Sequence, residues 1–181
     1  MNKKIILFLS LFLFAFILSY GQGYSLGGGL EYNTTTENFG LNLRGYYNIG
    51  EHFCFGPELS YAFIGDEVIG NIEEDTSVFE INLNAHYIFE VFDERIGLYP
   101  LFGFNYTIED ISLTDLQTGN IESETEEIWG TNIGAGFHVP IKNFAPFLEY
   151  HYITGQLGEH VVAVGLLYTF NKNKHESKHK K

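Results

Sequence analysis

The sequence predicts an all-β fold, and more specifically an eight-stranded antiparallel up-and-down transmembrane β-barrel. Three observations carry this prediction. Large apolar residues alternate with small or polar ones along eight separate runs. The connectors between these runs are alternately short and long. The chain also begins with a segment typical of secretory signal peptides, which directs a protein out of the cytoplasm.

The N-terminal segment has two lysines, Lys3 and Lys4, followed by a largely apolar run over residues 5–18. The small residues Ser19 and Gly21 come next, so we expect a signal peptide over residues 1–21. The alternative is an anchoring helix, but the apolar run is shorter than the ~20 residues that a span needs. Cys54 is the only cysteine, which excludes both an intramolecular disulfide and a lipid-modified cysteine after the apolar run.

The strands of the barrel are expected within residues 22–170. The last run, HVVAVGLLYTF, shows the pattern best, because Val162, Val164 and Leu166 alternate with smaller residues. A period of two places such residues on one face of a strand. The eight runs cover residues 24–32, 39–49, 53–64, 78–90, 98–108, 128–139, 145–154 and 160–170.

The connectors fall into two sets. One set is short and the other is longer, apart from a turn near Gly155, and this asymmetry is typical of outer-membrane barrels, which have short periplasmic turns and longer external loops. The short connectors are residues 51–52, 93–95 and 141–143, and the long ones are residues 33–38, 65–77 and 109–127.

The two faces of the predicted strands differ in chemistry. One face is almost continuous Phe, Tyr, Leu, Ile and Val, and the other mixes Gly, Asn, Glu, His and Arg. Eight strands enclose only enough room for ordinary packing, so the large apolar side chains must face outward, toward lipid. Aromatic residues near the run ends would form interfacial girdles: Tyr32, Phe39, Phe53, Phe63, Phe79, Phe89, Tyr106, Trp129, Tyr152 and Phe170.

The segments LFGFNY and GTNIGAGFHVP and the final strand VGLLYTF, which ends in Phe170, resemble strands of small eight-stranded outer-membrane barrels of the OmpA/OmpX type. The resemblance covers residues 23–170 and implies a porin-like barrel in the outer membrane of a Gram-negative bacterium. It also implies that outer-membrane lipids and the barrel-assembly machinery are partners. That family includes anchors, adhesins and a few enzymes, so the resemblance implies a location rather than a chemistry.

Charge separates the barrel from its tail. Residues 22–170 contain three basic residues, Arg44, Arg95 and Lys142, against 22 acidic ones, which excludes nucleic acid as a partner. Residues 171–181 are basic and contain no apolar side chain, so we expect a disordered tail that lies solvated or near anionic headgroups.

The polar face is expected to hold an ion cluster. If residues 50–51 centre the second hairpin, Arg44 and Glu58 fall opposite each other, and Glu149 lies across the barrel from them. We expect Arg44, Glu58 and Glu149 to form a structural plug, because buried charges need partners. A conduction path is the alternative. The acids expected to face inward are Glu31, Glu58, Glu80, Glu90 and Glu149.

The two longest connectors are rich in acids. They lack the alternating ligands and the distal Glu of a calcium-binding loop. The simplest interpretation is a solvated surface, and the functional alternatives are divalent cations that bridge to lipopolysaccharide or a basic partner. The acids are Asp66, Glu67, Glu73, Glu74 and Asp75 in one connector, and Glu109, Asp110, Asp115, Glu122, Glu124, Glu126 and Glu127 in the other.

No catalytic, cofactor or metal site is predicted. Ser60 is the one well-placed inward serine, and nothing pairs it with His86, His138 or His151. We therefore expect a non-catalytic outer-membrane protein that serves envelope integrity or surface interaction. The alternatives are a membrane-embedded lipid-modifying enzyme and a soluble secreted lipocalin-like barrel, although the Gly-x-Trp signature of the latter is missing near the first strand.

Overall fold

The computed structural model describes residues 23–93, 95–156 and 158–170, without the side chains of residues 63, 65–67 and 69. The predicted signal peptide (1–21) and basic tail (171–181) lie outside the described residues. Asp66 and Glu67 contribute only their backbone.

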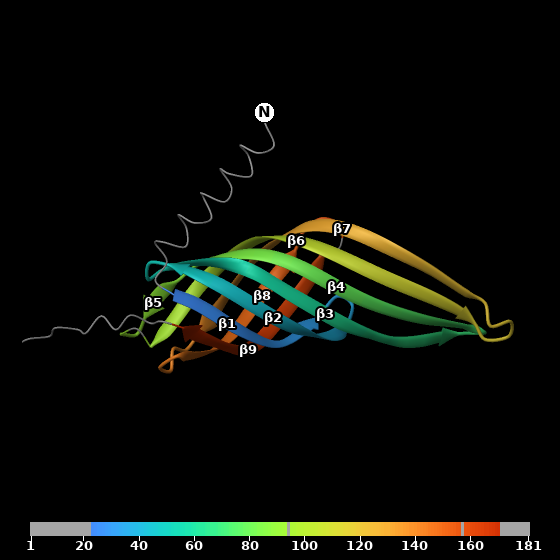
Figure 1. Cartoon of the computed structure of the whole chain (residues 1–181), viewed down its shortest axis with the longest axis horizontal. Helices are drawn as coiled ribbons and strands as arrows, with labels where there is room; N and C mark the ends of the chain where they lie inside the picture. The colour runs from blue at the N-terminus through green and yellow to red at the C-terminus, as the bar shows by residue number, and fades with distance from the viewer. Residues whose placement is uncertain (1–22, 94, 157, 171–181) are drawn as a thin grey trace, which may run out of the picture.

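The described chain is a closed antiparallel β-barrel, as predicted (Figure 1). Strands adjacent in sequence pair with each other, except that β4 and β5 both pair with β6. β1 closes the barrel by pairing with β9 from Tyr24 opposite Phe170. The strands are β1 (Gly23–Asn33), β2 (Asn38–Ile49), β3 (Phe53–Ile69), β4 (Ile72–Tyr87), β5 (Phe89–Val91), β6 (Ile96–Asp115), β7 (Ile121–His138), β8 (Phe144–Ile153) and β9 (Glu159–Phe170).

The barrel has eight strands around its wall, because β4 and β5 are two parts of one predicted strand. The break falls at Ile88, whose backbone N–H donates to the carbonyl oxygen of His52 at 2.6 Å. Both parts pair with β6. Glu90 follows the break and lies opposite Gly97, which shares the inward face of β6 with Tyr99. It therefore continues the inward face, as expected, but it is exposed at the end of the strand.

The strands end where predicted on the short-turn side, but the two long acidic connectors are not loops. Residues 65–77 and 109–127 are mostly strand, because β3, β4, β6 and β7 run on beyond the barrel wall as a four-stranded sheet (Figure 1). The pairing of β4 with β6 continues to Ile72 opposite Asp115. We call this sheet, residues 64–78 and 109–127, the projecting sheet. Apolar residues there, such as Ile111 and Leu113, share their face with acids such as Glu109, so the continuous apolar period that marks a barrel strand is missing.

The tip of the β6–β7 hairpin is closed by Asp115. Its carboxylate accepts backbone N–H bonds from Gln117 at 2.8 Å and from Thr118 at 3.1 Å. Gly119 follows in the left-handed region, at a φ of 72°, which a glycine adopts without strain. The two backbone donors hold the pKa of Asp115 below its usual range.

Burial in this molecule is inverted relative to a water-soluble protein. Arg44, Glu58 and Glu149 are each 1 % exposed, whereas Phe39 is 67 % and Trp129 is 72 % exposed. Aromatic pairs lie near the ends of the apolar belt, such as Tyr106 with Trp129 at a ring separation of 4.5 Å. An apolar exterior around a polar interior is the distribution that a transmembrane barrel requires. Among the described residues no helix is long and apolar enough to cross a membrane.

Candidate functional site

The predicted ion cluster lies in the lumen. Arg44 on β2 places Nη2 3.1 Å from a carboxylate oxygen of Glu58 on β3 and Nη1 3.3 Å from one of Glu149 on β8. Glu31 on β1 lies 3.8 Å from the same guanidinium. The ring of Phe147 covers the guanidinium carbon at 4.2 Å, so one cation lies among three carboxylates and an aromatic face.

Two tyrosines that the sequence analysis did not single out complete this cluster. Tyr46 donates its hydroxyl to Glu58, and Tyr99 donates to Glu149 at 3.1 Å. Position 136 makes room for the second ring, because a Cβ added to Gly136 would lie 2.6 Å from Tyr99. Tyr46 shares the period-two face of Arg44, so the alternation could have identified it.

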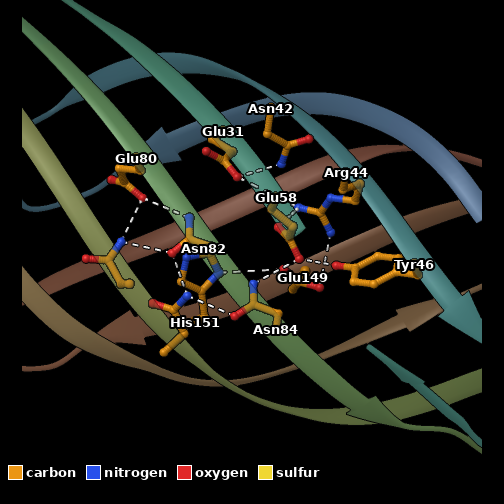
Figure 2. Close-up of polar contacts among 12 residues, drawn as sticks. Glu31, Asn42, Arg44, Tyr46, Glu58, Glu80, Asn82, Asn84, Glu149 and His151 are labelled. Atoms are coloured by element: carbon orange, nitrogen blue, oxygen red, sulfur yellow. Dashed lines mark hydrogen bonds and ion pairs between the residues drawn. The ribbon is translucent and has the colours of Figure 1, made fainter. Parts of the chain in front are cut away.

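A ladder of amides extends the cluster across the lumen (Figure 2). Asn84 donates to Glu58 at 2.9 Å and accepts from Asn132 at 2.9 Å. Asn132 also donates to Asn82 at 2.8 Å, and Asn82 donates to Glu80 at 3.3 Å. Charged and amide groups therefore form one connected set across the lumen, in which Arg44 Nε, Asn132 Oδ1 and Glu149 Oε1 have no hydrogen-bond partner among the described residues.

The histidines join this network. His151 Nδ1 lies 3.6 Å from Glu149, and His86 Nε2 lies 3.8 Å from it. His86 also stacks on Tyr99 at a ring separation of 4.6 Å. Neither histidine is bonded to Ser60, whose hydroxyl has no partner among the described residues, so the serine–histidine arrangement of nucleophilic catalysis is missing there. No group of three potential ligands among the described side chains is placed to hold a metal ion.

The acids of the projecting sheet fall on two faces. Residues directly opposite in an antiparallel pair share a face, so the register assigns each acid. Glu109 lies opposite Glu126, and Leu113 lies opposite both Glu74 and Glu122. Two sets follow: Glu74, Glu109, Glu122, Glu124 and Glu126 continue the lumen face, while Glu73, Asp75, Asp110 and Glu127 continue the outer face.

Like charges directly opposite each other destabilise a sheet. Glu109 shows the effect, because its partial burial, followed by the charges of Glu126 and Glu74, raises its pKa above the usual range. The projecting sheet thus concentrates negative charge although this lowers its stability. An extension with a purely structural role would not require such a concentration of charge.

The projecting sheet also has two unpaired edges. Pairing of β7 with β8 begins only at Asn132, and pairing of β2 with β3 stops at Phe63. Residues 121–130 of β7 and 64–69 of β3 therefore have no described strand on their outer sides. Such edges present a row of backbone N–H and C=O groups that can pair with another chain.

The closed wall, apolar belt and polar lumen define a small outer-membrane β-barrel. Residues 8–170 match the family described as outer membrane protein beta-barrel domain, and the chain belongs to this family. A search of the curated proteins found no match.

Solved structures of the same fold agree with this assignment. The attachment invasion locus protein Ail of Yersinia pestis is 20% identical, with a TM-score of 0.56, 82% of this chain covered and 97% of Ail. The N-terminal barrel of OprF from Pseudomonas aeruginosa is 18% identical, with a TM-score of 0.56 and coverage of 83% and 98%. A major outer-membrane protein of Thermus thermophilus is 14% identical, with a TM-score of 0.65 and coverage of 82% and 99%. At these identities the likeness concerns the fold alone.

Proposed function

We propose that the protein is a non-catalytic surface protein of the Gram-negative outer membrane, which uses its barrel as an anchor and its projecting sheet to dock a basic partner. The observation that carries this proposal is the four-stranded extension of β3, β4, β6 and β7 beyond the apolar belt. A barrel that served only as an anchor would have no need for it.

The orientation follows the rule that periplasmic turns are short. The short turns join β2 to β3, β5 to β6 and β7 to β8, and both ends of the described chain lie on that side. The projecting sheet then points away from the cell, where it can meet other surfaces or secreted molecules.

Charge selects the class of partner. The basic residues of the barrel body are Arg44, Arg95 and Lys142. Arg44 is buried, and the other two lie at the short-turn side, so the outer end carries an excess of acids. Ail of Yersinia pestis was solved with the heparin analogue sucrose octasulfate, a polyanion. The charge of this chain disfavours such a ligand and favours a polycation.

The unpaired edge of β7 supplies the geometry for docking. An extended basic segment that pairs with residues 121–130 would gain main-chain hydrogen bonds. Its alternate side chains would then reach Glu122, Glu124 and Glu126. The outward-facing Ile121 and Trp129, 68 % and 72 % exposed, offer apolar contacts on the other face.

This proposal is tested with the folded full-length mature protein in lipid nanodiscs. An alternating lysine–valine decapeptide should bind, and a glutamate–valine decapeptide should not. Replacing Glu122, Glu124 and Glu126 together by Gln should weaken binding by about tenfold or more, since each charge-assisted contact contributes. Glu37→Gln, at the β1–β2 turn of the same end, is the matched control. Equal binding of both peptides, or no effect of the triple change, would contradict the proposal.

A second function is supported by the absence of lysine and arginine from the outer hairpins. Contact of these hairpins with anionic lipopolysaccharide would require bridging divalent cations. In this case Mg²⁺ should increase the binding of lipopolysaccharide to the wild-type protein and should have little effect on the triple Gln variant. Binding that is independent of Mg²⁺ would exclude this role.

The lumen network supports a structural function rather than conduction. One arginine, several carboxylates and a set of amides are joined across the lumen, and an eight-stranded wall leaves no room for a bypass. Planar-bilayer recordings should show no steady conductance. An open channel in the wild-type protein would contradict a structural plug.

A further inference from the structure

A small cavity lies at the end of the lumen from which the projecting sheet rises. Its volume is about 40 Å³, which is room for an ammonium group with a water molecule, since a single water needs ~10–15 Å³. Four carboxylates, Glu31, Glu80, Glu109 and Glu159, line it from β1, β4, β6 and β9. The cavity is separate from the groups that contact Arg44, except that Glu31 both lines the cavity and contacts Arg44.

The register explains why space remains there. One row across five strands runs from Glu31 through Gly40, Ala62 and Val78 to Glu109. The carboxylates stand at the two ends of this row, and its middle consists of a glycine, an alanine and a valine. Small residues in the middle therefore leave the gap, and acids border it.

A buried hydroxyl in the neighbouring row points to an occupant. Ser60 lies opposite Glu80 on one side and Asn42 on the other, and it is 5 % exposed. Ser60 lines the cavity, and its Oγ has no hydrogen-bond partner among the described residues. Buried polar groups without a partner are uncommon in folded proteins, so this hydroxyl has hydrogen-bonding capacity that an occupant of the cavity would use.

The carboxylates of the cavity lack a cation of their own. Arg44 lies 3.8 Å from Glu31, but its guanidinium already contacts Glu58 and Glu149 at shorter distances. Burial and the charges of Glu126 and Glu74 raise the pKa of Glu109, which also acts on Glu159. A positive guest would relieve this repulsion.

We propose that this cavity binds a primary ammonium group, carried by a lysine side chain or by the end of a polyamine. An ammonium head has three donors and a compact charge, which suits Ser60 Oγ and carboxylates on several sides. No three described carboxylates are close enough together to chelate a metal ion.

The test uses the full mature protein in nanodiscs at constant ionic strength. Calorimetry and chemical-shift titration with methylammonium are compared with tetramethylammonium, which has the same charge and no donor, and with Mg²⁺. Spermidine serves as the longer probe. The variants are Glu159→Gln and Glu109→Gln, which remove one charge each, and Ala62→Leu, which fills the cavity. Glu73→Gln, on the opposite face of β4, is the matched control.

The proposal expects saturable binding of methylammonium and spermidine and none of tetramethylammonium. Each Gln variant in the cavity should bind about tenfold more weakly, the loss expected for one charge-assisted hydrogen bond. Ala62→Leu should abolish binding, and Glu73→Gln should bind like the wild type. Should Ala62→Leu fail to fold, as judged by gel mobility before and after heating, Ser60→Ala takes its place and should weaken binding.

Three results would overturn the proposal. Equal binding of tetramethylammonium and methylammonium would show that hydrogen bonding has no part. Saturation by Mg²⁺ that methylammonium cannot displace would assign the cavity to a metal ion. If Glu73→Gln weakened methylammonium binding as much as the cavity variants do, binding would depend on the general negative charge of this end and not on the cavity. Methylammonium cannot pair with the β7 edge, so this test is independent of the peptide experiment.

Discussion

At the scale of single residues, Arg44 holds the lumen together. It is the only basic side chain inside the described barrel apart from the histidines, and the carboxylates of Glu58 and Glu149 lie 3.1 and 3.3 Å from it. A charge that loses its partner in a buried site is far more costly than the intact pair is stabilising. Arg44 is therefore the position at which one substitution has the largest expected effect.

Arg44→Met should lower the free energy of unfolding by about 3–5 kcal/mol, because two buried carboxylates would lose their cation. Urea unfolding in detergent micelles measures this change. A second replacement, Glu149→Gln, made in the Arg44→Met background, should recover part of the loss. An unchanged unfolding midpoint in Arg44→Met would show that the cluster contributes nothing to stability.

Gly136→Val should destabilise the barrel by about 1–3 kcal/mol, as overpacking of a filled interior does. A Cβ at this position would lie 2.6 Å from the ring of Tyr99, so the ring must move and Glu149 would lose a donor. Ala135→Val, at the neighbouring position on the lipid side, is the control. Similar unfolding midpoints for the two variants would contradict a specific role for Gly136.

At the scale of elements, the projecting sheet is a set of strands without a continuous apolar face, because Ile72, Ile111 and Leu113 share their face with acids. The registers of β4 with β6 and of β6 with β7 continue from the barrel into this sheet, whereas that of β3 with β4 shifts between Ile64 and Glu67. Asp115 and Gly119 close the tip of the β6–β7 hairpin. The stability of the sheet therefore depends on backbone pairing and on few side-chain contacts. The facing acids work against it.

The charge of Glu109 makes this sheet pH-dependent. Folding raises the pKa of this carboxyl group, so the folded state binds its proton more tightly than the unfolded state does. The sheet therefore becomes more stable as the pH falls from above the raised pKa to the usual pKa of a glutamate. The groups that face Glu109 are Glu126 on β7, Glu74 on β4 and Glu159 on β9. Amide exchange in β6 and β7, corrected for intrinsic rates, should slow as the pH is lowered through that window. Exchange that stays constant or quickens there would contradict the role of Glu109.

Glu126→Gln should slow amide exchange in the same hairpin at neutral pH and should reduce its pH dependence, since it removes the charge opposite Glu109. Glu73→Gln lies opposite Val68 and Thr114 and should have little effect. If both variants protect the hairpin equally, net charge rather than the facing pair would be responsible.

At the scale of the whole molecule, the exterior of the barrel requires a lipid or detergent environment. The single tryptophan, Trp129, is 72 % exposed and contacts Tyr106 near the end of the apolar belt. Tryptophan favours this interfacial level in membranes. The fluorescence of Trp129 can therefore report the depth of this residue in the bilayer.

Lipids brominated near the headgroup should quench Trp129 fluorescence more than lipids brominated near the chain ends. The matched control places a tryptophan at Ile133, further along the same lipid face, in a Trp129→Phe background. Ile133 is 52 % exposed on the wall, and Ile133→Trp should be quenched more strongly from the deeper position. Emission typical of water, without quenching by either lipid, would contradict the membrane assignment.

The fold class, the strand order and the polar lumen could all be predicted from the sequence. The alternation of large apolar residues with Asn, Glu and Arg is local information, and a period of two assigns each side chain to a face without knowledge of its partners. The location of Arg44, Glu58 and Glu149 on one face followed from this rule, and so did the outward direction of aromatic residues such as Phe39 and Trp129.

The pairing of distant strands, and the points where that pairing stops, emerged only from the three-dimensional structure. Acidic residues 109–127 have no apolar period, so nothing local distinguishes a solvated loop from strands held by pairing with β4. Tyr99 reaches Glu149 because Gly136 on the next strand leaves room. The cavity beside Ser60 likewise depends on small residues of neighbouring strands. Contacts of this kind join residues far apart in the chain, and closure of the barrel brings them together.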